Sequence, residues 1–467
     1  MPENVSSKYT VLSPGKEDDP EESFDGPSYT IGEAIATIGF GKQQWMLFLV
    51  SGLCWIADAF EVMLLTYLLP AVQKEWSMNG FWESTVASIS FFGMLFGSPF
   101  WGLTSDRFGR RVAFFGSAAI TAFFGLLSAF SPNVGMLILF RFLVGFGVSG
   151  SHVAFSLFVE FLPLQSRGRC LIALQAFWTL GTVLESALAW LVLPTMGWRW
   201  LLALSAIPMV LLVVFYFFIP ESPRYLMQCG RIVEAEQVLQ AAAKKNGVLL
   251  PEGRLILPEE EEQQKGKLAF MSLIRPTYLT MTITLWIIWF CNAFSYFGII
   301  LVTPEYFEWR GDGGSSSEQE IFLTTFITSV AEFPGLLITA FAVDRIGRKK
   351  AQASLFGVCG VFTLFLCYKE SFAFSTFTAI VSRMCISGAY AATWLYTPEI
   401  YPTHIRSTGL GVCNVMAKLA GLCTPYVAHL FNGISLVIPI VFYAVGCFIG
   451  TFAAIRLPQE TSKMDIK

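Results

Sequence analysis

Ionisable side chains occur inside the long apolar stretches of this 467-residue chain. Near the centre of a bilayer such a residue costs about 2.5 to 3.5 kcal/mol on insertion scales, so each one calls for a partner or a water-filled cavity. Asp58 and Glu61 lie one helical turn apart in the first stretch. The others, spread over later stretches, are Arg141, His152, Glu185, Glu332, Arg383 and Lys418. This set predicts a polar cavity within a helix bundle.

The composition indicates that these residues lie in a membrane. Hydrophobic residues make up 54% of the chain and charged residues 14%, which is far from the averages of soluble proteins. A helix needs about 20 mainly apolar residues to cross the ~30 Å hydrocarbon core. We therefore predict an all-α membrane protein with twelve spans, at 45–69, 84–104, 112–130, 134–158, 170–193, 199–219, 277–303, 320–342, 351–368, 372–396, 407–430 and 433–457.

Basic residues concentrate on one side of these spans. With the N-terminus in the cytosol, most Lys and Arg fall in cytosolic loops, so both termini are predicted to be cytosolic. The predicted division of the chain is a cytosolic tail at 1–44, a six-helix bundle at 45–219, a cytosolic central loop at 220–276, a second six-helix bundle at 277–457 and a cytosolic tail at 458–467.

The two predicted bundles are repeats of each other. Four matches recur roughly 240 residues apart, each at the same point of its half. They pair residues 102–111 with 342–350, 160–167 with 399–406, Arg141 with Arg383, and 220–222 with 458–461. Matches in one register predict parallel halves related about the membrane normal.

Charged residues of the repeated loops can form a contact that opens and closes. Asp106 can accept from Arg110 or from amides at a helix N-terminus, while Gly102 and Gly109 permit tight turns. We predict a cytosolic gate made of Asp106, Arg110, Glu160, Arg167, Asp344, Arg348, Glu399 and Arg406. A structural ion pair that never opens is the alternative for the two glutamates.

These motifs resemble those of the major facilitator superfamily. The carriers of the resemblance are the G-x-x-x-D-R-x-G-R-R loop from Gly102, the R-x-x-x-G-x-G-x-x-G motif from Arg141, and P-E-S-P-R at 220–224. The segments at 38–41, 197–200, 331–335 and 397–403 resemble the branch of nicotinate transporters and synaptic vesicle 2-related proteins.

The resemblance implies that the chain carries a small polar organic solute by alternating access. In the superfamily the loop motif holds the halves together on the cytosolic side when the carrier faces outward. The branch's Trp-x-x-Gly-Thr-x-x-Glu pattern matches residues 178–185, and its Asn-Ala-Phe-x-Tyr pattern matches residues 292–296. The resemblance places both patterns on spans that line the cavity.

The substrate is either an organic anion or an organic cation. For an anion such as nicotinate, Lys418 supplies the counter-charge, although relatives usually have Arg there. For a cation, acidic residues bind and aromatic faces add cation–π contact. The predicted binding residues are Glu61, Glu185, Asn292, Tyr296, Glu332, Tyr390, Trp394 and Lys418. The candidates for coupling to a proton are Asp58, Glu61, Arg141 and Glu185.

Several other functions are disfavoured. A net charge of -3 offers no basic field for nucleic acid. The sequence has no metal-spaced His cluster, P-loop, nucleophile elbow or dinucleotide motif, so we predict no enzyme activity, cofactor or metal site. We expect a monomer in the plasma membrane or a vesicle membrane. The alternatives are an organic cation or sugar transporter of the same fold, or a non-transporting vesicle-membrane receptor.

Overall fold

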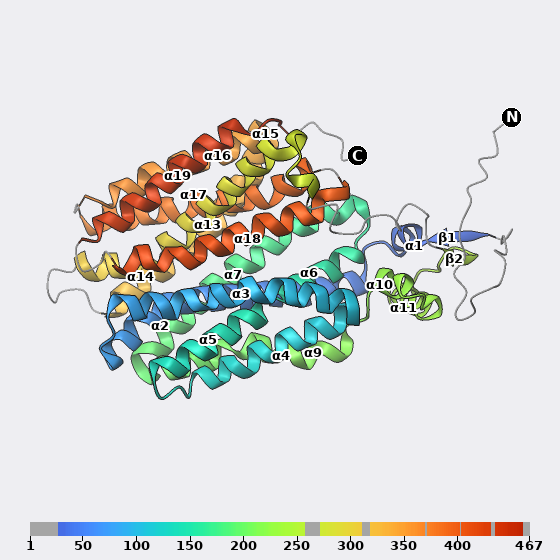
Figure 1. Cartoon of the computed structure of the whole chain (residues 1–467), viewed down its shortest axis with the longest axis horizontal. Helices are drawn as coiled ribbons and strands as arrows, with labels where there is room; N and C mark the ends of the chain where they lie inside the picture. Colours follow the sequence, from blue (N-terminus) through green and yellow to red (C-terminus); the bar gives the residue numbers. More distant parts are fainter. Residues whose placement is uncertain are drawn as a thin grey trace.

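The computed structural model describes residues 27–256, 271–310, 318–368, 371–401, 403–430 and 435–460. Two helix bundles lie side by side (Figure 1). The first described strand and the end of the last helix lie at the same end of the molecule, which we call the terminal end. We call the other end the opposite end.

The first bundle contains the six spans expected there. They are α2 (Lys42–Trp76), α3 (Gly80–Phe108), α4 (Arg110–Ser128), α5 (Val134–Val148) continued by α6 (Ser151–Glu160), α7 (Leu164–Met196), and α8 (Trp198–Ser205) continued by α9 (Ile207–Phe215) and the short 3-10 helix η1 (Tyr216–Phe218).

The second bundle repeats this arrangement. Its spans are α13 (Pro276–Arg310), α14 (Glu318–Val330) continued by α15 (Glu332–Ile346), α16 (Arg348–Phe365), α17 (Phe372–Ile400), α18 (Thr403–Leu430) and α19 (Val437–Arg456). Among the described residues, 11 spans are apolar enough to cross a membrane by composition alone. The remaining span is α16, whose 18 residues open on three basic side chains. The predicted twelve-helix fold is confirmed.

Breaks inside two spans have a local cause. The helix is interrupted at Ala206 just before Pro208, and at Ala331 just before Pro334. Proline has no N–H for the carbonyl four residues earlier, and its ring crowds that carbonyl, so the helix breaks in the preceding turn. The break between α5 and α6 falls at Ser149 and Gly150, inside the glycine motif that follows Arg141.

Glycine allows α3 and α5 to approach with their backbones almost in contact. A Cβ atom on Gly145 would lie 2.0 Å from the backbone oxygen of Ser90, and one on Gly93 would lie 2.2 Å from that of Phe142. No side chain fits at either position, so these glycines are required by the close packing of two helices.

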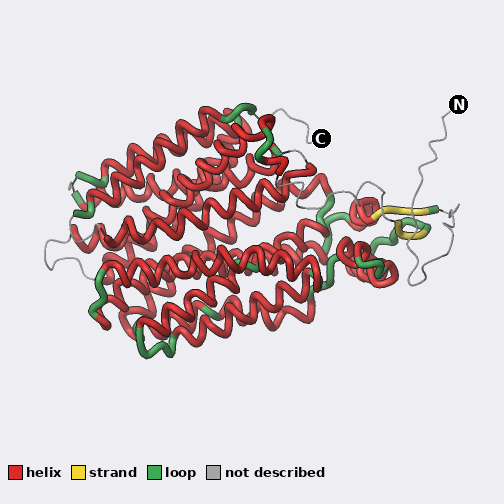
Figure 2. Tube along the Cα trace, viewed as in Figure 1, coloured by secondary structure: helices red, strands yellow, loops and turns green. Residues whose placement is uncertain are grey.

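The ends of the bundle and the central segment form a small folded cap at the terminal end (Figure 2). Its elements are β1 (Ser28–Thr30) paired in parallel with β2 (Arg254–Ile256), α1 (Ile31–Ile38), α10 (Pro223–Gln228) and α11 (Ile232–Asn246). Asn246 connects them to α2: its side chain accepts from the Gln43 amide at 3.0 Å and donates to the Ile38 carbonyl at 3.2 Å. The segments expected to be a tail and a loop thus contain ordered structure.

Substituting Gly145 by Ala should lower the melting temperature of the protein. The added methyl group would overlap the Ser90 carbonyl, and overpacking of a tight interface typically costs about 1–3 kcal/mol. Gly102→Ala on α3 is the matched control, since nothing lies within 4 Å of its Cβ position. Thermal unfolding in detergent compares the two, and equal melting temperatures would contradict the close approach.

Candidate functional site

A cavity of about 280 Å³ lies between the two bundles at the middle of the spans. Both halves contribute to its wall. The polar and aromatic side chains that line it are Trp55, Asp58, Ser149, Ser151, His152, Gln175 and Trp178 from the first half, and Tyr390, Trp394, Asn414 and Lys418 from the second. The volume and the mixed wall suit a small organic solute.

Two opposite charges face this cavity from different halves. The Asp58 carboxylate accepts a hydrogen bond of 2.7 Å from the Ser151 hydroxyl. The Lys418 ammonium donates to the hydroxyl of Ser98 on α3. Neither has an ion pair as its nearest polar partner, so each keeps capacity for a charged ligand.

Aromatic rings from both halves meet along the cavity wall. The ring of Trp55 lies 5.6 Å from that of Trp394 and 6.0 Å from that of Trp178, both in edge-to-face geometry. Tyr390 stacks on Tyr296, which lies behind it, at 5.6 Å and 21°. The wall therefore offers indole and phenol faces to a flat or cationic group.

Glu61 lies in an ion pair within the first half and does not line the cavity. Its carboxylate is 2.8 Å from the Arg141 guanidinium, which also donates to Ser128 at 2.9 Å. Arg141 is fully buried. The predicted shared face of Asp58 and Glu61 is therefore divided: the first faces the cavity and the second is paired.

The second half has an equivalent pair at the repeated position. Arg383 lies 3.0 Å from Glu332, and both side chains are fully buried. The carboxylate of Glu332 also accepts from Tyr296 at 3.1 Å and from Thr182 of the first half at 3.3 Å. Because Trp178 donates to the Tyr296 hydroxyl at 2.7 Å, a chain of hydrogen bonds runs from the cavity wall to this pair.

Two other predicted binding residues are also buried away from the cavity. Glu185 accepts from the Ser205 hydroxyl at 2.8 Å, and Asn292 donates to Thr393 at 2.7 Å. Of the eight predicted residues, the cavity wall contains Tyr390, Trp394 and Lys418. Glu61, Glu185, Asn292, Tyr296 and Glu332 lie behind it or within separate pairs.

Three lining residues were not among the predicted binding set. Trp55 precedes Asp58 by three positions and Asn414 precedes Lys418 by four, so helical spacing from the charged residues could have indicated both. Gln175 has no comparable signal in the sequence. His152, treated as a packing residue, lies 2.6 Å from Asn414 across the two halves.

The first predicted gate cluster lies at the terminal end of the first half. Arg110 is 2.5 Å from Asp106 and 3.6 Å from Glu160, and Glu160 also accepts from the Ser222 hydroxyl. The carboxylate of Glu221 accepts from the Arg110 amide at 2.8 Å and so caps the N-terminus of α4.

The glycine before this helix is needed for the cap. Gly109 has φ of +100°, and a Cβ there would lie 2.4 Å from the Glu221 carboxylate. The second half repeats the device: Gly347 has φ of +93°, and Glu460 accepts from the Arg348 amide at 2.7 Å. A side chain at either glycine would be strained and would displace the capping carboxylate.

The second gate cluster is centred on Arg348, whose guanidinium lies 3.3 Å from Glu399 and 3.7 Å from Asp344. Arg406 donates to the Tyr401 carbonyl at 3.3 Å. The side chain of Arg167 lies outside the described residues. The contacts given above for the two clusters run within one half each.

At the opposite end, by contrast, hydrogen bonds join the halves. The hydroxyls of Ser186 and Ser329 are 2.9 Å apart, linking α7 to α14. On the other side of the seam, Ser84 and Ser88 of α3 donate to carbonyls of α18 at 3.1 Å and 2.8 Å. The halves are thus closed against each other at this end.

Two repeated six-helix halves around a central cavity define a protein of the major facilitator fold, and the comparisons agree. The structure matches the xylose transporter XylE from E. coli in a partially occluded inward-open conformation, with a TM-score of 0.71 and 19% identity over 90% of this chain and 99% of that one. The profile of the family described as "Sugar (and other) transporter" matches residues 45–464, and the chain belongs to this family.

Two curated relatives cover almost the whole chain. Synaptic vesicle 2-related protein of Xenopus laevis is 39% identical over 453 residues, which is 93% of this chain and 81% of the relative. Organic cation/carnitine transporter 7 of Arabidopsis thaliana is 38% identical over 478 residues, covering 94% of this chain and 96% of the relative. The suspected family branch is confirmed.

Cysteines at positions 58 and 61 should differ in reactivity toward a water-soluble thiol reagent. Asp58→Cys faces the cavity and should be labelled, whereas Glu61→Cys is buried beside Arg141 and should be protected. The exposed native thiols Cys229 and Cys423 are first replaced by Ser. Equal labelling of the two positions would contradict the described orientation of α2.

Proposed function

We propose that the protein is a secondary active transporter of a small organic carboxylate whose body is flat or carries a cationic nitrogen. Nicotinate and related pyridine carboxylates are the leading class. The observation that carries this proposal is the cavity between the halves, where the Lys418 ammonium and aromatic rings face the same space.

A carboxylate fits the cationic side of the cavity. Lys418 is 7% exposed and donates to one neutral hydroxyl, so its charge has incomplete compensation within the protein. A buried charge without a counter-charge is costly, and a ligand carboxylate would remove that cost. The rings of Tyr390 and Trp394 would then contact the body of the ligand.

An organic cation is the second candidate, because Asp58 faces the cavity beside tryptophan rings. Aromatic cages with a carboxylate recognise quaternary ammonium groups. The name of the Arabidopsis relative, an organic cation/carnitine transporter, supports this class. Glu61, Glu185 and Glu332, which we had expected to bind a cation, do not line the cavity, so Asp58 takes that role.

Alternating access follows from the way the halves are joined. We infer that the terminal end faces the cytosol, because most basic loop residues lie there, and that the described conformation opens toward it. Opening of the opposite end requires the Trp178–Tyr296 and Thr182–Glu332 hydrogen bonds between the halves to break. Trp178 also lines the cavity, so a ligand contacts one member of this connection directly.

Lys418→Ala should abolish binding of nicotinate and spare binding of choline, whereas Asp58→Asn should do the reverse. Each substitution removes the only charge that we assign to that ligand. Lys418→Arg is the control, since it keeps the positive charge. Binding is measured by thermal shift of purified protein, and uptake by flux into proteoliposomes. Loss of choline binding in Lys418→Ala with nicotinate binding retained would discard the carboxylate proposal, and absence of flux for a broad panel would favour a receptor.

Asp58 is also our candidate for coupling to protons, because a carboxyl in a wet cavity can exchange its proton with either side in turn. Asp58→Asn should abolish accumulation driven by a pH gradient and retain exchange of substrate down its own gradient. Glu185→Gln is the matched control, since Glu185 is buried against Ser205 and should remain gradient-driven. Loss of the pH-driven component in Glu185→Gln alone would move the coupling role to that residue.

A further inference from the structure

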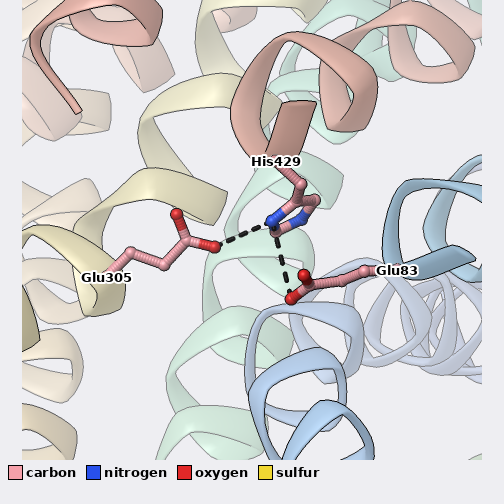
Figure 3. Close-up of side chains that lie close together, drawn as sticks. All are labelled: Glu83, Glu305 and His429. Carbon is pink, nitrogen blue, oxygen red and sulfur yellow. Dashed lines mark ion pairs between the residues drawn. The ribbon is translucent and has the colours of Figure 1, made fainter. Parts of the chain in front are cut away.

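Away from the cavity, three buried ionisable side chains meet at the opposite end of the seam between the halves (Figure 3). Glu83 lies in the first turn of α3 in the first half. Glu305 and His429 lie near the ends of α13 and α18 in the second half. The transport scheme proposed above uses none of the three.

The imidazole stands between the two carboxylates. Its Nδ1 lies 2.8 Å from Oε1 of Glu305 and 3.6 Å from Oε1 of Glu83. One potential ligand atom from each residue lies within 4.8 Å of the others. The His429 side chain is 1% exposed, and its Nε2 has no hydrogen-bond partner among the described residues. A neutral ring does not balance two buried carboxylates, so the cluster calls for a further positive charge.

We propose that Glu83, Glu305 and His429 bind a divalent transition-metal ion, represented by Zn²⁺, across the seam between the halves. Carboxylate and imidazole groups together suit Zn²⁺ and its first-row neighbours. A +2 ion neutralises both carboxylates, and a water molecule can complete a four-coordinate site.

The observed spacing is close to that of a tetrahedral site. Zn–N and Zn–O bonds of about 2.0 to 2.2 Å place two ligand atoms roughly 3.3 to 3.5 Å apart. The 3.6 Å between His429 and Glu83 has nearly this value. The 2.8 Å between His429 and Glu305 must lengthen by less than about 1 Å, which a side-chain torsion can supply.

The position of the site gives the metal a conformational role. The ligands come from both halves, and Ser84 beside Glu83 already donates to the Pro425 carbonyl of α18. The complete ligand set exists only while this end is closed. A bound ion therefore favours the closed arrangement over one in which α3 separates from α13 and α18. Zn²⁺ should inhibit turnover by holding this end shut.

Titration of Zn²⁺ into the purified full-length protein tests the site directly. We expect saturable binding by calorimetry and a higher melting temperature with Zn²⁺ than without it. Glu83→Gln and His429→Gln should each weaken Zn²⁺ binding by at least about 10-fold. His152→Gln is the matched control, because it removes a membrane-helix histidine outside the cluster. Absence of binding to the wild type, or wild-type affinity in both cluster variants, would overturn the proposal.

A second variant and a second ion guard against misfolding and against thiol binding. Glu83→Gln/Glu305→Gln leaves no unbalanced carboxylate in the cluster, so it should fold and still fail to bind Zn²⁺. Co²⁺ bound to the wild type should show the visible bands of nitrogen and oxygen ligands. Intense near-ultraviolet bands of thiolate ligation, as Cys229 or Cys423 would give, would overturn the assignment. These measurements need no substrate, so their outcome is independent of the proposed transport function.

Discussion

The architecture depends on the cost of holding charge in a low-dielectric interior. Two fully buried arginines, Arg141 and Arg383, occupy equivalent positions of the repeat, and each is held by one carboxylate. Removing one partner of such a pair typically costs about 3–5 kcal/mol, because it leaves an uncompensated charge. The pairs therefore fix the helices around them, and the charges left available for a ligand are the ones at the cavity surface, Asp58 and Lys418.

The two pairs are not used in the same way, although the sequence repeat makes them equivalent. Glu61 is held entirely by its own half, through Arg141. Glu332 accepts in addition from Thr182 of the other half and from Tyr296, whose hydroxyl is bound by Trp178. The first pair stabilises one bundle, whereas the second also joins the bundles to each other. A duplicated structure has thereby gained a rigid half and a half whose central ion pair senses the interface.

The helices could be predicted from the sequence because lipid requires apolar stretches of fixed length, and the repeat added their pairing. The facing of individual side chains could not, because helices that are buried on every side carry little amphipathic signal. Asp58 and Glu61 are three positions apart, which is about 60° around a helix, enough to place them in different surroundings. The same limit explains why Tyr390, Trp394 and Lys418 line the cavity while Glu185 and Asn292 do not.

Contacts between distant segments were also beyond the sequence. Alignment of the repeat at Pro220 and Pro458 sets Gln459 opposite Glu221, yet the residue that caps the second helix is Glu460. A shift of one residue in a loop is invisible to a register drawn from helices. The pairing of β1 with β2 joins segments on either side of the whole first bundle, and no local pattern announces it.

The cluster of Glu83, Glu305 and His429 shows the same limit for chemistry. Metal motifs are recognised by short spacings, and these residues come from three helices in two halves. Their convergence is a property of the closed seam, so it exists in one conformation of the protein. Any ion or proton that the cluster holds must be released or lose ligands when that end opens. Its binding energy then enters the equilibrium between the two access states. Charges that pair within a half set the stability of the bundles, whereas charges that meet across the seam set which way the cavity opens.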